Sequence, residues 1–218
     1  MERVAYVLVS LWKHPMCVAK RFETLPEPRL TLTQSVYAGA HFTTISLSNT
    51  SNWRAMYGKT SRDAKQHFVK WLATSNFTHA WHFEDDVYAR NWSKTLARLH
   101  KGGKLPDLMG HISYDPLNFF YRSYRPHSAS QHIVYWPIVL MSRSLARYIA
   151  TRRDQRGHHE VMTHDMCLRM GGRCVNVSLP GVRLSATWIK PRPVLKGVEP
   201  IHPVKCVTSQ SRPQSRVL

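Results

Sequence analysis

Apolar and polar positions along this chain follow two different periods. Short apolar or alternating runs, rich in β-branched and aromatic residues, predict strands over residues 4–12, 41–47, 77–83, 108–113, 133–141 and 173–177. Apolar residues three and four positions apart predict helices over residues 30–40, 61–74, 91–100, 142–151 and 160–170. Ser142 is a suitable N-cap for the fourth helix, and Gly171 and Gly172 end the fifth.

Strands and helices alternate over the first two-thirds of the chain, without internal repeats. This order is typical of an α/β fold with a largely parallel sheet. We expect one domain over residues 1–205, because this length is enough to enclose a full hydrophobic core. We expect residues 206–218, which are polar and basic, to form a disordered tail.

The charge balance is strongly basic. Among 218 residues there are 31 Lys and Arg against 13 Asp and Glu, a net charge of +18. Such a field attracts nucleic acid, anionic lipid and nucleotide diphosphates alike, so it indicates an anionic partner without naming one. No recognised nucleic-acid motif accompanies it. No run of eighteen apolar residues is present either, so we expect no transmembrane segment.

The cysteines and glycosylation sequons bear on the cellular compartment. Cys17, Cys167, Cys174 and Cys206 have no zinc-site spacing, and we expect buried thiols, with a disulfide as the alternative in a lumenal protein. Four Asn-x-Ser/Thr sequons favour the secretory route, whereas the first residues show no signal-peptide pattern. The expected location is therefore a Golgi or secretory lumen for a longer precursor, and otherwise the cytoplasm.

Three consecutive acids, Glu84, Asp85 and Asp86, follow the strand predicted at 77–83. In open α/β sheets, ligands bind beyond the carboxyl ends of the strands. Adjacent carboxylates repel one another, and a divalent cation with a preference for oxygen ligands, such as Mg²⁺ or Mn²⁺, removes that conflict. The alternative interpretation is a solvated acidic turn or a helix N-cap. The scarcity of acids elsewhere in so basic a chain favours the metal site.

A helix, a strand and then EDDV resemble the DXD region of GT-A glycosyltransferases, which use nucleotide-sugars. The resemblance implies a Rossmann-type three-layer sandwich with a mostly parallel central sheet. It also implies that Asp86 is the main metal ligand, that Asp85 supports it, and that Glu84 faces the nucleotide-sugar. Glu84 departs from the usual Asp at the first position.

The segment THDMCLRMGGRCV (residues 163–175) is similar to a second region of inverting GT-A enzymes. In that family its Asp is the general base that deprotonates the acceptor hydroxyl, which makes Asp165 the implied base and Arg169 its neighbour. His164 stands where the family more often has an acid. Glu160, one turn upstream, is the alternative base. Without the resemblance, Asp165 would be read as an acid that stabilises the N-terminus of a helix.

Further candidates are weaker. The resemblance implies His202 as a closing metal ligand and Lys205 as a base beside the diphosphate, although a lone histidine is more often a surface or packing residue. Lys59 and Arg62, at the start of the second predicted helix, are candidate phosphate partners, against a solvated basic face. Aromatic candidates for stacking on sugar rings, each more often a packing residue, are Trp136, Tyr114, Tyr121 and Tyr124.

Together these features predict a metal-dependent, inverting glycosyltransferase. We expect Mn²⁺ or Mg²⁺ as cofactor, a nucleotide-diphosphate sugar, UDP-linked for preference, as donor, and the hydroxyl of a glycan, protein or small molecule as acceptor. One alternative is a basic module that binds nucleic acid or polyanions without catalysis. The other is a metal-dependent nucleotidyl or phosphoryl transferase.

Overall fold

The computed structural model describes residues 2–9, 20, 22–33, 43–46, 57–84, 87–100, 103–114, 132–152 and 159–177, although not the side chains at 32–33, 43–46, 57–64 and 114. The described strands and helices are, in chain order, β1 (Val4–Val9), β2 (Arg29–Thr33), β3 (Thr43–Ser46), α2 (Tyr57–Thr74), β4 (His79–Glu84), α3 (Trp92–Leu99), β5 (Leu108–Tyr114), β6 (His132–Ser142), α5 (Arg143–Thr151), α6 (His159–Arg169) and β7 (Cys174–Asn176).

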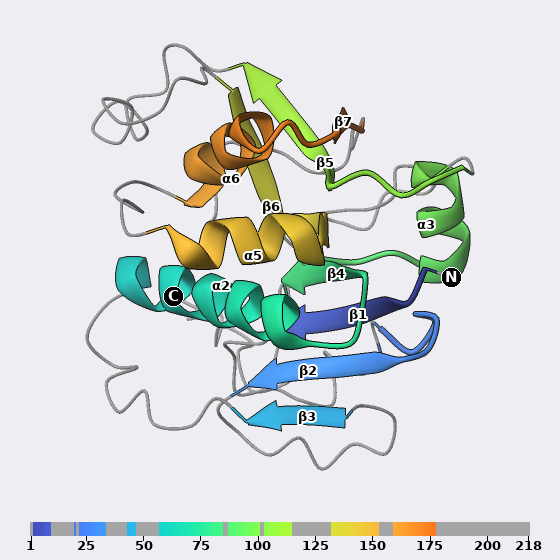
Figure 1. The fold of residues 1–218 in the computed structure, drawn as a ribbon. Coiled ribbons are helices and arrows are strands. Elements are labelled where there is room, and N and C mark those ends of the chain that lie inside the picture. Colours follow the sequence, from blue (N-terminus) through green and yellow to red (C-terminus); the bar gives the residue numbers. More distant parts are fainter. Residues whose placement is uncertain are drawn as a thin grey trace, which may run out of the picture.

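The strands form one seven-stranded sheet in the order β3-β2-β1-β4-β6-β5-β7 (Figure 1). β6 runs antiparallel to its neighbours β4 and β5, and the remaining pairs are parallel. The predicted α/β fold with a mostly parallel sheet is therefore confirmed. The chain builds outward from β1 to β3 and then returns through α2 to β4 on the other side of β1.

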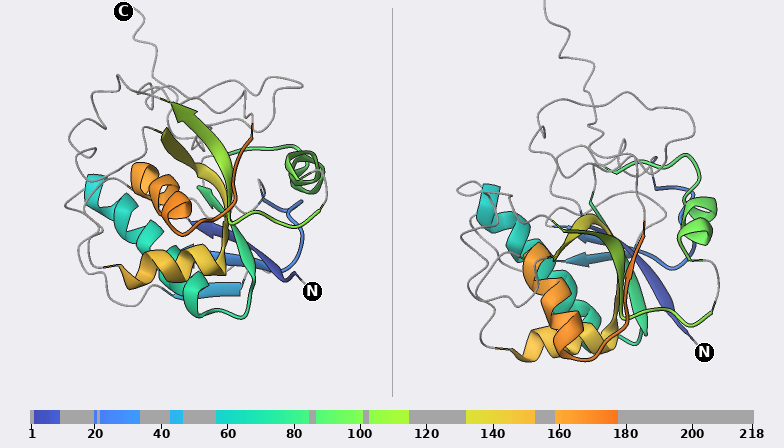
Figure 2. Two further views of the ribbon diagram at one scale, coloured as in Figure 1. Left: turned by 45° about the horizontal axis from the view of Figure 1, so that its top comes forward. Right: turned by 90° about the horizontal axis from the view of Figure 1, so that it is seen from above.

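Helices cover both faces of the sheet, which gives three layers. α2, α5 and α6 lie on one face and α3 on the other, as the view from above in Figure 2 shows. Two hydrophobic cores result: Phe68 and Leu72 of α2 belong to the first, and Trp92 and Leu96 of α3 to the second. β4 serves both, because its alternate residues face opposite sides of the sheet.

Local sequence explains where the helices begin and end. The side chain of Asn91 accepts a hydrogen bond from the backbone N–H of Lys94 and caps α3. Ser142 caps α5 in the same way through Leu145, as predicted. α6 ends before Gly171, whose φ of 70° is a left-handed conformation that favours glycine.

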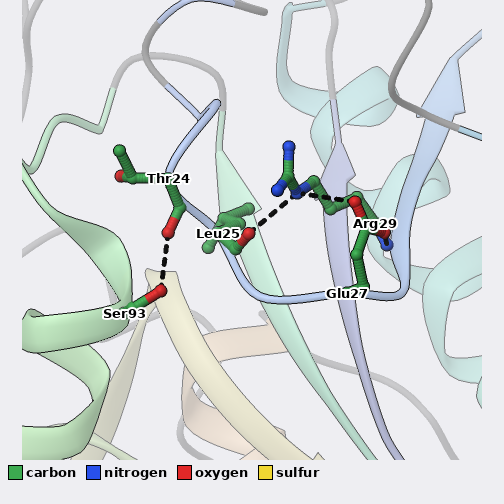
Figure 3. A network of polar contacts seen from close by, with 5 residues as sticks. All are labelled: Thr24, Leu25, Glu27, Arg29 and Ser93. Carbon is green, nitrogen blue, oxygen red and sulfur yellow. Dashed lines mark hydrogen bonds and ion pairs between the residues drawn. The ribbon is translucent and has the colours of Figure 1, made fainter.

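The segment before β2 is tied to α3 by polar contacts (Figure 3). The Ser93 hydroxyl donates to the Thr24 carbonyl at 2.8 Å. The Arg29 guanidinium donates to the Leu25 carbonyl at 2.8 Å and forms an ion pair with Glu27. These contacts lie at the amino end of β2, the edge of the sheet opposite to the carboxyl ends of the parallel strands.

Two sequence predictions are wrong. The helix predicted at 30–40 is instead strand β2 over Arg29–Thr33, because pairing with β1 and the burial of Thr31 outweigh a helical spacing. The thiols predicted for Cys167 and Cys174 are instead joined in a disulfide between the end of α6 and β7. Cys17, Cys206, residues 34–40 and the tail predicted at 206–218 lie outside the described residues.

None of the helices in the described residues has the length and apolarity needed to cross a membrane.

Candidate functional site

The acidic triplet begins at the point where the order of the strands reverses. Glu84 is the last residue of β4, and it pairs with Val9, the last residue of β1. The connections that leave β1 and β4 run to opposite sides, so the carboxyl ends of these two strands mark the switch point at which open α/β sheets bind ligands. Asp85 and Asp86 follow Glu84 directly and lie outside the described residues.

Glu84 is paired with a buried cation. The Lys65 ammonium lies 2.8 Å from Glu84 Oε1, and the side chains of Lys65 and Glu84 are 7% and 28% exposed. Lys65 comes from α2, where it lies on the same face as the core residues Phe68 and Leu72. A lysine on the buried stripe of a helix is costly without a charge partner, so the helical spacing contained a signal for this pair that our sequence analysis did not use.

His159 is a second hydrogen-bond partner of Lys65. Its Nε2 atom lies 2.7 Å from the Lys65 ammonium, although the two residues are 94 positions apart in sequence. An ammonium group only donates hydrogen bonds, so Nε2 is the acceptor and the ring hydrogen is on Nδ1. His159 is the first residue of α6. The contact therefore connects the beginning of α6 with the end of β4 through α2.

The Trp136 ring packs against the cluster formed by Glu84, Lys65 and His159. The ring lies 5.7 Å from the Lys65 ammonium and 5.5 Å from the His159 ring. The indole N–H donates to the Thr163 hydroxyl at 3.2 Å, and that hydroxyl donates to the His159 carbonyl at 2.7 Å. Trp136 is 1% exposed, which agrees with the interpretation as a packing residue and not with stacking on a sugar ring. Its ring packs within the protein and steadies the start of α6.

His82, two residues before Glu84 on β4, is fully buried. Burial is the main cause that lowers its pKa to about 3; the Glu84 charge opposes this shift, and the Lys65 charge adds to it. Its Nδ1–H donates to the Trp136 carbonyl at 3.0 Å, and the rings of Phe68 and Trp136 pack against it. His82 is therefore a neutral packing residue at physiological pH.

A cavity of about 70 Å³ opens beside Lys65 between α2, α5, α6 and β6. Its polar lining includes Lys65, His159 and Thr163, and its apolar lining includes Met162 and Met166. A water molecule needs about 10–15 Å³ of such volume, so the cavity has room for a few small molecules of that size and is too small for a nucleotide. A ligand of nucleotide size must therefore bind outside this cavity.

The two candidate bases occupy different positions on α6. Glu160 lies in its first turn, next to His159, and is buried. Asp165 lies six residues beyond His159, about 9 Å along the helix axis, so it does not stabilise the N-terminus of α6. Asp165 is 1% exposed, and its Oδ2 atom pairs with the Arg169 guanidinium at 2.8 Å.

His164 stands beside Asp165 and faces the ring of His132 on β6 at 5.4 Å. Burial is the largest cause of its lowered pKa, the His132 charge adds to it, and Asp165 opposes both. His164 is therefore neutral at physiological pH, unlike the acid for which it stands in the resemblance.

The structure describes only part of the predicted metal and phosphate sites and does not test how their ligands are placed. Within the described residues there is no group of three His, Cys, Asp or Glu side chains placed to hold a metal ion. His202 and Lys205 lie outside those residues, as do Tyr121 and Tyr124. Lys59 and Arg62 lie in the first two turns of α2, although the positions of their side chains and of Tyr114 are not described.

Comparisons with known proteins do not assign this chain to a family. No family model and no curated protein matches the chain. Among solved structures, the mannosyltransferase PcManGT from Pyrobaculum calidifontis, in complex with GDP-Man and Mn²⁺, is similar at 11% identity and a TM-score of 0.49. The match covers 81% of this chain and 55% of that one, so this chain spans little more than half of that enzyme.

The galactosyltransferase LgtC, in complex with donor and acceptor sugar analogues, is similar at 12% identity and a TM-score of 0.46. That match covers 80% of this chain and 73% of the other. At these identities and scores the assignment of a function to this chain depends on the site itself.

Proposed function

We propose that this chain is a nucleotide-sugar-dependent glycosyltransferase whose donor binds at the carboxyl ends of β1 and β4. The observation that supports this most strongly is the position of Glu84, the first of three consecutive acids, at the switch point of the sheet with a buried lysine as its partner. Ligands of open α/β sheets bind at this point, and an acidic run there suits a cation and the diphosphate that it would carry.

The pairing of Glu84 supports a division of roles within the triplet. One of the three negative charges is offset by Lys65, so Glu84 is not needed as a metal ligand and two carboxylates remain for a cation. We propose that Asp86, with Asp85 and His202, holds Mn²⁺ or Mg²⁺, because carboxylate oxygens and an imidazole nitrogen suit these ions. The ion would supply charge stabilisation to the departing diphosphate.

The cationic side chains provide the proposed contacts to phosphate. Lys59 and Arg62 belong to the first two turns of α2, where backbone N–H groups and the helix dipole favour an anion. Lys205 is the proposed basic residue whose positive charge lies beside the diphosphate. With Glu84 facing the sugar or ribose hydroxyls, these groups orient the donor so that its anomeric carbon is exposed to attack.

The remaining role is to accept a proton from the acceptor hydroxyl as its oxygen attacks the anomeric carbon and the bond to the diphosphate breaks. Glu160 becomes our first candidate, because it adjoins His159 at the end of α6 that contacts Lys65. Both carboxylates are buried, so burial does not separate the two candidates, but the ion pair of Asp165 with Arg169 favours a structural role for Asp165. Glu160→Gln should then lower kcat by about a hundredfold or more, and Asp165→Asn should mainly lower stability.

Donor binding tests the proposed function directly. Thermal unfolding and calorimetric titration with UDP, GDP, CMP and their common sugars, each with and without Mn²⁺, should give stabilisation by one nucleotide only when the metal is present. Asp86→Asn should abolish that response. Glu27→Gln is the matched control, because its carboxylate lies at the amino end of β2 with 66% of its side chain exposed.

Product analysis separates the proposal from its rivals. A glycosidic product supports the transferase, whereas nucleotide turnover without one would indicate a nucleotidyl or phosphoryl transferase. An unchanged metal response in Asp86→Asn would overturn the metal assignment. The absence of any metal-dependent response would overturn the proposed function itself.

A further inference from the structure

The surroundings of Lys65 are more complete than an ion pair alone requires. Its ammonium lies at hydrogen-bonding distance from both Glu84 and His159, and the Trp136 ring lies beside it. A buried lysine is stable only when such partners replace the water that it has lost. Lys65 thus joins α2 to β4, β6 and α6 at the edge of the sheet where the triplet begins.

We propose that Lys65 is a positioning residue for the donor site: it fixes the direction of the Glu84 carboxylate, and His159 fixes Lys65. This inference rests on the proposed function, in which Glu84 faces the hydroxyl groups of a nucleoside-diphosphate sugar. Without the Lys65 partner, a glutamate side chain followed by two aspartates in sequence would be repelled by like charges and could rotate between several orientations. A charge-assisted hydrogen bond to a buried ammonium removes that freedom before the donor arrives.

His159 gives the arrangement its second anchor. The backbone carbonyl of His159 accepts a hydrogen bond from the Thr163 hydroxyl, and this hydroxyl accepts one from the Trp136 indole N–H. These two bonds attach the first turn of α6 to β6. The His159 ring therefore presents Nε2 to Lys65 from a fixed element. A shift of α6 would move Lys65, and Lys65 would carry the shift to Glu84.

A structural role and a positioning role for Lys65 predict different effects of its substitution. Loss of a structural pair lowers stability and leaves the donor KM of the folded fraction unchanged. Loss of a positioning residue raises the donor KM, and it does so only while Glu84 is present. A double-mutant cycle on donor KM measures that dependence directly.

The experiment compares Lys65→Met, Glu84→Gln and the double variant by initial rates of transfer at varied donor concentration. We expect Lys65→Met to raise the donor KM about tenfold with a smaller change in kcat. We expect the double variant to be no worse than Glu84→Gln alone. Lys65→Arg, which keeps the charge, should recover part of the loss, and Lys94→Met, at an exposed lysine on α3, should match the wild type.

Two variants of His159 complete the test. His159→Leu should raise the donor KM in the same direction as Lys65→Met, and His159→Gln, which keeps an acceptor for the Lys65 ammonium, should raise it less. If Lys65→Met does not fold, Lys65→Arg and His159→Leu provide the same comparison. An unchanged donor KM in folded variants, or effects of Lys65→Met and Glu84→Gln that simply add, would overturn the positioning role.

The two proposals fail in different ways. A wild-type protein that turns over no nucleotide-sugar overturns the proposed function and the role of Lys65 with it. A wild-type protein that does so normally, with an additive cycle, overturns the role of Lys65 alone.

Discussion

His82 shows how burial of one side chain makes stability depend on pH. Its pKa in the folded protein, about 3, lies below the ordinary value of 6.5 that it regains on unfolding. As the pH falls below 6.5, the unfolded chain takes up a proton that the folded protein does not, so the stability present above pH 6.5 is progressively lost down to pH 3. His79 and His164 act in the same direction, because burial also lowers their pKa values.

We therefore predict that the free energy of unfolding falls between pH 6.5 and pH 5, with a contribution from His82 that approaches about 1.4 kcal/mol per pH unit near pH 5. Urea unfolding followed at pH 7, 6 and 5 measures this slope. His82→Leu should lower stability at pH 7, because the Trp136 carbonyl loses the hydrogen bond that His82 donates to it. Since leucine cannot be protonated, the variant should also show a smaller decrease of stability with falling pH. A variant with the wild-type slope would contradict the assignment to His82.

At this scale the sequence identified acids more readily than their partners. Glu84 was recognisable because it follows an apolar strand. Lys65 and His159 were not, because a residue's contacts with distant segments depend on the packing of α2 and α6 against the sheet. Only the presence of Lys65 on an apolar helical stripe indicated that its charge had to be matched.

The disulfide between Cys167 and Cys174 closes the connection from α6 to β7. A cross-link around a short loop restricts the unfolded chain, and for seven residues of separation the loop-entropy relation gives about 2–3 kcal/mol of stabilisation. We predict that Cys167→Ala/Cys174→Ala lowers the free energy of unfolding by about that amount. Guanidinium unfolding under non-reducing conditions measures the difference.

Reduction provides the control for this prediction. A reducing agent should destabilise the wild type more than the double variant, because the variant has already lost this bond. Equal destabilisation of the two proteins would show that this disulfide contributes nothing. Disulfides persist mainly in oxidising compartments, so a bond that forms in the cell supports the secretory location that the sequons favour.

The elements differ in how far local sequence determined them. Long amphipathic segments such as α2 were predicted because their periodicity is repeated over several turns. Residues 30–33 were assigned to a helix because a few apolar positions fit that spacing as well as they fit a strand. β2 is a strand because β1 offers it a parallel partner, which is a property of the sheet and not of the segment.

The site as a whole depends on the order of the strands. The sequence predicts that an acidic run follows a strand, but it does not say that β1 and β4 are neighbours or that the switch point lies between them. That arrangement is what makes the end of β4 a place for a ligand. The sequence therefore located the chemistry, and only the fold relates it to a binding site.

The net charge of +18 predicts a second kind of binding that differs from the proposed function in its dependence on salt. A polyanion such as heparin or single-stranded DNA should bind with an affinity that falls steeply between 50 and 200 mM salt, by about a thousandfold if six phosphates are contacted. Because this attraction arises from the field of many side chains, Mn²⁺ and Asp86→Asn should leave it unchanged.

Nucleotide-sugar binding should behave in the opposite way, with a weak salt dependence and a requirement for Mn²⁺ and Asp86. Parallel titrations of UDP-sugar and heparin against wild type and Asp86→Asn at two salt concentrations distinguish the two modes. If the nucleotide-sugar shows the same steep salt dependence and ignores the metal, its binding is only another effect of the net charge. The polyanion-binding module would then replace the glycosyltransferase as the better account of this chain.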